Sequence, residues 1–89
     1  MNTFKLKISS PDGDAFAGDA CILSLRGSEG DLAVMANHAP FITSVVPCTV
    51  RFETEDGVER FGKTDGGILS VRENSVTLLS ASFVMDQEL

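Results

Sequence analysis

Apolar and polar residues alternate with a period of two near the start of this chain. Phe4, Leu6 and Ile8 are separated by lysines, which predicts a strand whose apolar side chains face a core. Further short apolar runs predict strands at 20–25, 32–35, 41–46, 49–54, 58–61, 68–71 and 76–79. No apolar stripe at helical spacing persists, and residues 81–89 are expected either to begin a helix or to fray.

Turn-forming residues divide the predicted strands about every eight to twelve positions, a spacing typical of a β-sandwich or barrel. The strongest hairpin signal is Asp56-Gly57, which lies between two β-rich runs. It predicts a type I′ turn, because that turn needs a positive φ at both central residues. The fold class is therefore expected to be all-β.

Length, composition and charge narrow the class of protein. The chain has 89 residues, enough for one domain, and its 43% hydrophobic content argues against disorder. It has neither an apolar run that could span a bilayer nor the hydrophobic region of a signal peptide, so a soluble, cytosolic protein is expected. The net charge of −6 argues against nucleic acid or an anionic membrane as a direct partner and favours a basic protein surface.

Residues 27–41 concentrate the side chains that could carry chemistry. His38 would serve as a base oriented by Asp31 or Glu29, but no known nucleophile signature surrounds it. A phosphate site would need a lysine and a following helix. One histidine and two distant cysteines do not make a metal site, so both cysteines are expected to be reduced thiols. No catalytic residue, metal or cofactor is expected, and the segment is predicted to dock on another protein.

Two motifs in this segment resemble a known family. Residues 27–32 (Gly-Ser-Glu-Gly-Asp-Leu) and 38–41 (His-Ala-Pro-Phe) resemble the N-terminal domain of the epsilon subunit of bacterial F-type ATP synthase, which has a G-x-x-G-acid-Leu turn and then a G-H-A-P loop. Phe16-Ala17-Gly18 is similar to the family's F-x-G, and residues 65–69 to its S-G-G step. Asn37 and Cys48 each replace a glycine of the family pattern; asparagine tolerates left-handed dihedrals, whereas the cysteine changes the turn after Pro47.

The resemblance implies a ten-stranded β-sandwich of two antiparallel sheets over residues 1–85, with residues 86–89 as a C-terminal tail. Full-length relatives continue with a two-helix domain, whose inhibitory role is not assigned to these residues. The implied protein is a non-catalytic subunit of the central stalk, or rotor, that couples proton-driven rotation to ATP synthesis. It would lie on the cytoplasmic face of the cell membrane as a peripheral part of the ATP synthase complex, touching the membrane only through that complex.

The resemblance also implies two partner-binding groups. The c-ring side would comprise Ser28, Glu29, Gly30, Asp31 and Leu32, and the gamma-subunit side Ser10, His38, Ala39, Pro40 and Thr43. The alternative is a free-standing β-sandwich that binds a small ligand, although the absence of Trp and Tyr argues against a carbohydrate site. The isolated domain is also a candidate for self-association.

Overall fold

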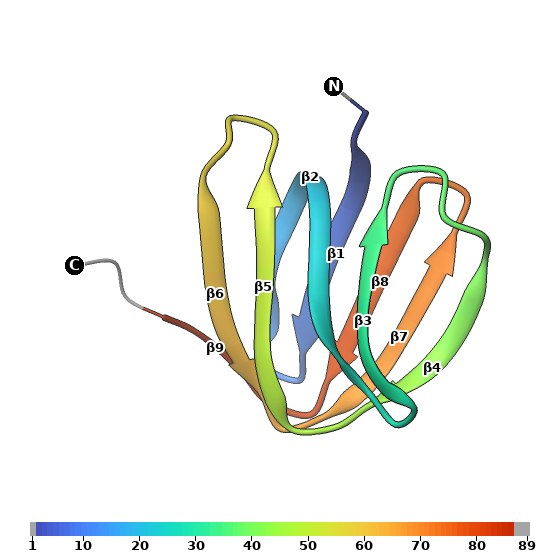
Figure 1. Ribbon diagram of the computed structural model, residues 1–89. Helices are drawn as coiled ribbons and strands as arrows, with labels where there is room; N and C mark the ends of the chain where they lie inside the picture. Colours follow the sequence, from blue (N-terminus) through green and yellow to red (C-terminus); the bar gives the residue numbers. More distant parts are fainter. Residues whose placement is uncertain (1, 87–89) are drawn as a thin grey trace.

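Residues 2–86 are described by the computed structural model, and they form nine β-strands and no helix (Figure 1). No helix among them could cross a membrane. The strands are β1 (Phe4–Ser10), β2 (Gly13–Gly27), β3 (Gly30–Met35), β4 (Phe41–Val45), β5 (Cys48–Thr54), β6 (Glu59–Thr64), β7 (Gly67–Arg72), β8 (Ser75–Ser80) and β9 (Phe83–Met85).

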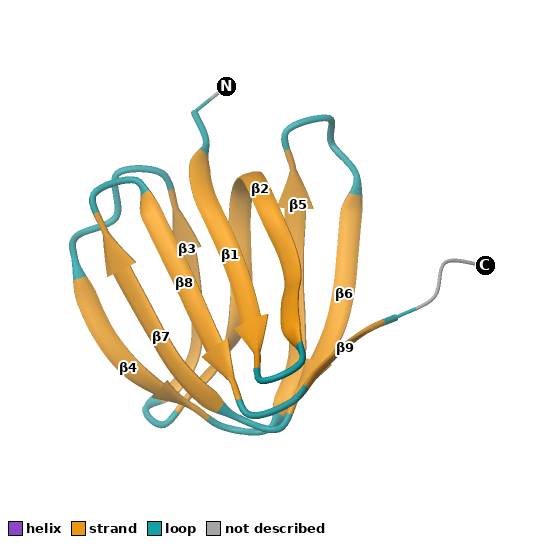
Figure 2. Ribbon diagram, turned by 180° about the vertical axis from the view of Figure 1, so that it is seen from behind, coloured by secondary structure: helices purple, strands orange, loops and turns teal. Residues whose placement is uncertain are grey.

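The strands form two layers that share β2. One layer follows the order β1, β8, β7, β4, and Figure 2 shows it in front. The other contains β3, β2, β5, β6 and β9, and faces the viewer in Figure 1. The first part of β2 pairs with β1 from Gly13 to Ala20, and its last part pairs with β3 from Ile22 to Gly27. Since β2 crosses from one layer to the other, it ties the two layers together.

The predicted all-β sandwich is confirmed, with corrections in detail. The described residues contain nine strands rather than ten. The register of β2 against β5 shifts between Ala20 and Ile22, and at this shift β2 passes from one layer to the other without a break. A single strand of 15 residues therefore belongs to both layers, which lowers the strand count. The sheets are not wholly antiparallel either, because β1 and β8 pair in parallel.

The expectation that residues 81–89 begin a helix or fray is wrong for Phe83–Met85, which form β9 and pair with β6. The Phe83 ring packs on Gly62, where an added Cβ would lie 2.5 Å from it. Of the proposed tail, residues 87–89 lie outside the described residues. The division of the chain at residue 85 stays a prediction.

The apolar side chains that alternate along β1 lie in the core, as expected. Phe4, Leu6 and Ile8 are 2%, 1% and 0% exposed. They pack with buried residues from both layers: Ala20, Leu23, Leu25, Val34, Val45, Val50, Phe52, Leu69, Val71, Val76 and Leu78. Phe16 adds a tilted ring contact to Phe52 at 4.6 Å between centroids. The core therefore lies between the two layers, and the outer faces of the layers are not part of it.

The hairpin at Asp56-Gly57 exists, but its predicted turn type is wrong. Only Gly57 has a positive φ, at 84°. The Gly57 amide donates to the Thr54 carbonyl at 2.9 Å, and the Thr54 amide donates to the Val58 carbonyl at 3.0 Å. This is the pattern of a type I turn followed by a left-handed glycine. The Asp56 carboxylate accepts from both the Thr54 hydroxyl and the Val58 amide, which holds this longer loop in place.

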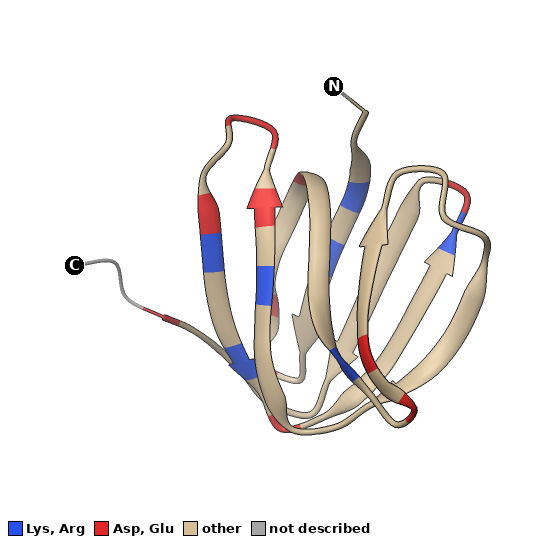
Figure 3. Ribbon diagram, in the orientation of Figure 1, with Lys and Arg blue, Asp and Glu red and all other residues tan. Residues whose placement is uncertain are grey.

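Loops collect at two ends of the sandwich. The hairpin end, at the bottom of Figure 1, holds turns 11–12, 28–29, 46–47, 65–66 and 81–82. The histidine end, at the top, holds loops 36–40, 55–58 and 73–74. Figure 3 shows acidic residues in the loops at both ends, whereas lysine and arginine lie on strands. Both ends thus present negative charge.

Candidate docking surfaces

The β2–β3 hairpin at the hairpin end depends on two glycines. Gly27 pairs with Gly30 across a two-residue turn of Ser28 and Glu29. Gly30 has a φ of 125°, which favours glycine. At Gly27 an added Cβ would lie 2.9 Å from a Leu32 methyl group and 3.3 Å from the Ser44 carbonyl oxygen. The turn is therefore tight, and both of its central residues are exposed.

Backbone hydrogen bonds attach this hairpin to the other layer. The Ser28 amide donates to the Ser44 carbonyl at 3.0 Å, and the Val46 amide donates to the Arg26 carbonyl at 3.1 Å. Gly27 also pairs with Val45 in β4. The hairpin is thus a rigid projection, which suits a surface that must keep its shape against a partner.

The charges of the hairpin are not equivalent. Arg26 Nε donates to Asp31 Oδ1 at 2.8 Å, and this bond raises the pKa of Arg26 above its ordinary value. The charge of Asp31 is therefore already matched within the chain. Glu29, at the tip, forms no ion pair with any described residue. Glu29 is the better candidate than Asp31 for a base on a partner.

Sequence reasoning missed Arg26. A signal was present, because a two-residue turn between Gly27 and Gly30 places residue 26 directly opposite residue 31. Cross-strand neighbours of opposite charge attract each other, so the ion pair follows from the turn length.

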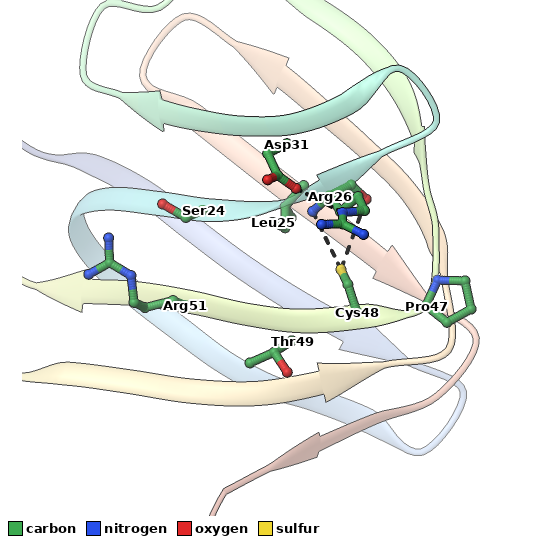
Figure 4. A pocket seen from close by; sticks show the side chains of 8 residues that line it. All are labelled: Ser24, Leu25, Arg26, Asp31, Pro47, Cys48, Thr49 and Arg51. Atoms are coloured by element: carbon green, nitrogen blue, oxygen red, sulfur yellow. Dashed lines mark hydrogen bonds and ion pairs between the residues drawn. The ribbon is translucent and has the colours of Figure 1, made fainter.

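A groove of about 430 Å³ lies beside the hairpin (Figure 4). It is lined by Ser24, Leu25, Arg26, Asp31, Pro47, Cys48, Thr49 and Arg51. Arg51 forms an ion pair with Glu59, so both arginines of the groove are already engaged. The Cys48 sulfur lies 3.4 Å from the Arg26 amide nitrogen and 3.9 Å from its carbonyl oxygen. The groove does not favour a ligand-binding function, because its cations are matched by acids of the same chain.

His38 lies at the histidine end, away from the predicted acids and hydroxyls. It is exposed, its Nδ1 lies 2.8 Å from the Ala39 carbonyl oxygen, and its ring lies 5.0 Å from the Phe41 ring. Asn37 precedes it with a φ of 68°, which confirms that asparagine takes the left-handed conformation at this position. Glu29 lies at the opposite end of the sandwich. The structure therefore does not bring a base and an orienting acid together.

The residues predicted for the gamma side are not adjacent. Ser10 ends β1 at the hairpin end, whereas Ala39 and Pro40 are exposed with His38 at the histidine end. Thr43 lies in β4, half-buried, and its hydroxyl would be 3.5 Å from a Cβ on Gly27. It thus lies nearer to the hairpin than to His38.

An exposed apolar surface connects these scattered positions. Ile42, Ile68 and Leu79 are 70%, 45% and 56% exposed on the outer face of β4, β7 and β8. Ile68 in β7 is directly opposite Leu79 in β8. Ile42 in β4 pairs with Ser70, two residues from Ile68, so Ile42 and Ile68 are diagonal neighbours. We call these three residues, with the uncharged Ser44, Ser70 and Thr77 between them, the apolar face.

The apolar face extends toward both separated parts of the predicted gamma side. Leu79 pairs with Ser9, which precedes Ser10, and Ile42 follows the loop that contains His38. Sequence reasoning missed the face, although pairs of consecutive apolar residues signal it: 41–42, 68–69 and 78–79 break the alternation. Apolar residues on both sides of a strand are typical of a sheet that is covered on both faces.

Within residues 2–86 no group of three or more His, Cys, Asp or Glu side chains could hold a metal ion. Cys21 and Cys48 are half-buried thiols, and Cys48 packs against the core.

The fold and its surfaces define a β-sandwich domain with a rigid acidic hairpin and a separate apolar face. The family model for the ATP synthase delta/epsilon chain β-sandwich domain matches residues 3–86. The chain therefore belongs to this family, and the resemblance inferred from its motifs is confirmed.

Relatives and solved structures agree with this assignment. The chain is 38% identical to the ATP synthase epsilon chain of Delftia acidovorans and 37% to that of Polaromonas naphthalenivorans, over all of its own length and 64% of theirs. Its fold matches a chain in the Euglena gracilis mitochondrial ATP synthase with a TM-score of 0.88 at 20% identity, covering 93% of this chain and 53% of that one. A chain in the Tetrahymena thermophila mitochondrial ATP synthase central stalk and c-ring matches with a TM-score of 0.74 at 11% identity, covering 90% and 64%.

Proposed function

We propose that this chain is a non-catalytic rotor module of an F-type ATP synthase, which binds the gamma subunit and the loops of the c-ring. One observation carries the proposal: this chain belongs to the delta/epsilon family and has two separate exposed surfaces of different chemistry. One is the acidic hairpin, and the other is the apolar face. A module that links two rotor parts needs two such surfaces.

The c-ring side is assigned to the hairpin of Ser28 to Leu32. Glu29 lies in its tip, and turns 11–12 and 65–66 at the same end of the sandwich add Asp12 and Asp65 without a lysine or arginine. A partner loop that carries an arginine would make a charge-assisted contact there. Asp31 would act indirectly, because its bond to Arg26 holds the base of the hairpin.

The gamma side is assigned to the apolar face, with Ser10 at one margin and His38, Ala39 and Pro40 at the other. Covering Ile42, Ile68 and Leu79 removes apolar area from water, at about 25 cal/mol per Å². Thr43 lies between this face and the hairpin, so it is a weaker candidate for the gamma contact.

Bound in this way, the domain transmits torque between the ring and the stalk and forms no covalent bond itself. It is peripheral to the membrane, on the cytoplasmic face, and reaches it only through the complex. The coupling of proton-driven rotation to ATP synthesis is then a property of the assembly.

Co-elution with the cognate gamma subunit on size exclusion tests the gamma side. Ile68→Arg should abolish co-elution, because it places a charge in the centre of the apolar face. Val84→Arg is the matched control, since Val84 is 64% exposed on β9 in the other layer. Failure of the folded native domain to bind gamma, or equal binding by both variants, would refute the assignment.

Proton pumping driven by ATP in membranes with the assembled complex tests the c-ring side. Glu29→Lys should lower pumping more than ATP hydrolysis, because it opposes a basic ring loop. Glu55→Lys makes the same charge change in the loop at the histidine end and should leave pumping unchanged. A larger loss with Glu55→Lys would contradict the assignment.

A further inference from the structure

The outer edge of β3 presents unpaired backbone groups. Arg26 points its carbonyl to the Val46 amide and its amide to the Cys48 sulfur, both away from β3. Its neighbour Asp31 is therefore in a non-hydrogen-bonded pair, and the Asp31 amide and carbonyl point away from β2. Because backbone groups alternate along a strand, those of Ala33 point the same way.

The carbonyl of Met35 supports this direction. It accepts from the His38 amide at 3.3 Å, on the side away from β2. Within the described residues β3 pairs only with β2. The backbone groups of Asp31 and Ala33 and the Met35 amide thus point away from β2 toward another strand, and the Met35 carbonyl has a second acceptor position beside its bond to His38.

This edge lacks the features that usually prevent strand pairing. Residues 30–35 contain no proline, no lysine and no register shift against β2. Their only charged residue, Asp31, is matched by Arg26. Met35 is 57% exposed, and Ala33 is exposed and small. The edge is therefore open to pairing.

We propose that a second copy of this chain occupies the edge, with β3 pairing antiparallel to β3 about a two-fold axis at Ala33. In this register Ala33 faces Ala33, Leu32 faces Val34, and Asp31 faces Met35 of the other copy. No like charges meet, and the smallest side chain lies on the axis. An isologous contact needs this self-complementarity, which argues for a second copy over an unrelated segment.

The exposed edge of β4 is a poorer site for the same pairing. The Ser44 carbonyl already accepts from the Ser28 amide, and Val45 pairs with Gly27. The hairpin therefore covers the last part of β4, whereas on β3 only the Met35 carbonyl accepts from a loop amide.

The dimer should be weak and salt-dependent. Pairing two short strands buries less than the roughly 1,200 Å² of a stable interface, which indicates a transient complex. Each copy carries a net charge of −6, so the copies repel at long range. Added salt screens this repulsion, and the dimer fraction should rise with ionic strength.

Sedimentation velocity over rising protein concentration, at low and high salt, tests the proposal. The native domain should show a concentration-dependent dimer. Ala33→Pro removes an outward amide that β2 does not use, so the domain should stay folded and become monomeric. Ala33→Val keeps the amide and should keep the dimer. Thermal unfolding of each variant verifies the fold.

Replacing Met35 with an acidic or a basic residue tests the register of the dimer without introducing a proline. Met35→Glu puts like charges opposite each other twice per dimer, and Met35→Lys puts opposite charges there. The dissociation constant of the Glu variant should exceed that of the Lys variant by about tenfold. Val84→Glu and Val84→Lys, exposed on β9, make the same changes in net charge and should differ much less.

A domain that stays monomeric at all protein and salt concentrations would overturn the proposal. So would a Glu-to-Lys difference in the dissociation constant that is equal at Met35 and Val84. A native monomer whose Ala33→Pro variant loses binding to another protein would identify a foreign strand as the occupant, which also overturns it. Binding to gamma through the apolar face is separate, so Ala33→Pro should still co-elute with gamma. The two proposals can therefore fail independently.

Discussion

Replacing Gly67 with alanine should destabilise the whole domain through a backbone clash. Gly67 lies in β7 between Ser80 of β8 and Val45 of β4. A Cβ at this position would lie 2.0 Å from the Leu79 carbonyl oxygen and 2.9 Å from the Ser80 Cα. Its φ is outside the left-handed region, so the effect is steric and not conformational.

The size of the effect follows from these distances. Carbon contacts are most favourable at about 3.5–4.0 Å, so the two strands must separate by more than about 1 Å. A separation of that size breaks roughly two ladder hydrogen bonds and strains the rest, a loss of about 3 kcal/mol. A chain of this length has a free energy of unfolding of only about 4–13 kcal/mol. Thermal unfolding should shift down by about 12–24 °C.

Gly57→Ala is the matched control for this prediction. Its φ of 84° penalises alanine, but an added Cβ would meet nothing within 4 Å. The cost should be about 1–2 kcal/mol from backbone conformation alone. Urea unfolding of both variants gives the comparison. A smaller loss for Gly67→Ala than for Gly57→Ala would show that β7 and β8 are not paired as described.

Two further variants test local interactions. Thr64→Val removes a buried hydroxyl that accepts from the Gly66 amide at 3.0 Å, so urea unfolding should show a loss of about 1–3 kcal/mol, whereas Thr64→Ser should retain most of the stability. Bonds from the Thr54 hydroxyl and the Val58 amide lower the pKa of Asp56. Its contribution to stability is therefore present above its unfolded pKa and lost as pH falls through its lower folded pKa. Asp56→Asn should flatten the acid side of the thermal stability profile, and an unchanged profile would contradict this.

Several features of this protein could be predicted from the sequence because they depend on neighbours along the chain. Alternation in residues 4–8 decided which side chains of β1 face the core. The hairpin at 54–58 was predicted in place but not in type, since Gly57 alone takes a positive φ and the Asp56 side chain stabilises a longer loop. The two motifs in residues 27–41 identified the family, which the whole-length comparison confirms.

Tertiary structure decided the features that depend on strand pairing over long distances. Only the pairing of β1 with β8 and of β4 with β7 brings Ile42, Ile68 and Leu79 together, and places Ser10 and His38 at opposite margins of one sheet. The pairing of β2 with β3 engages Asp31 with Arg26 and leaves Glu29 available. Periodicity is a local property that fixes which way a side chain points, whereas the partner of each strand edge depends on the packing of the entire chain.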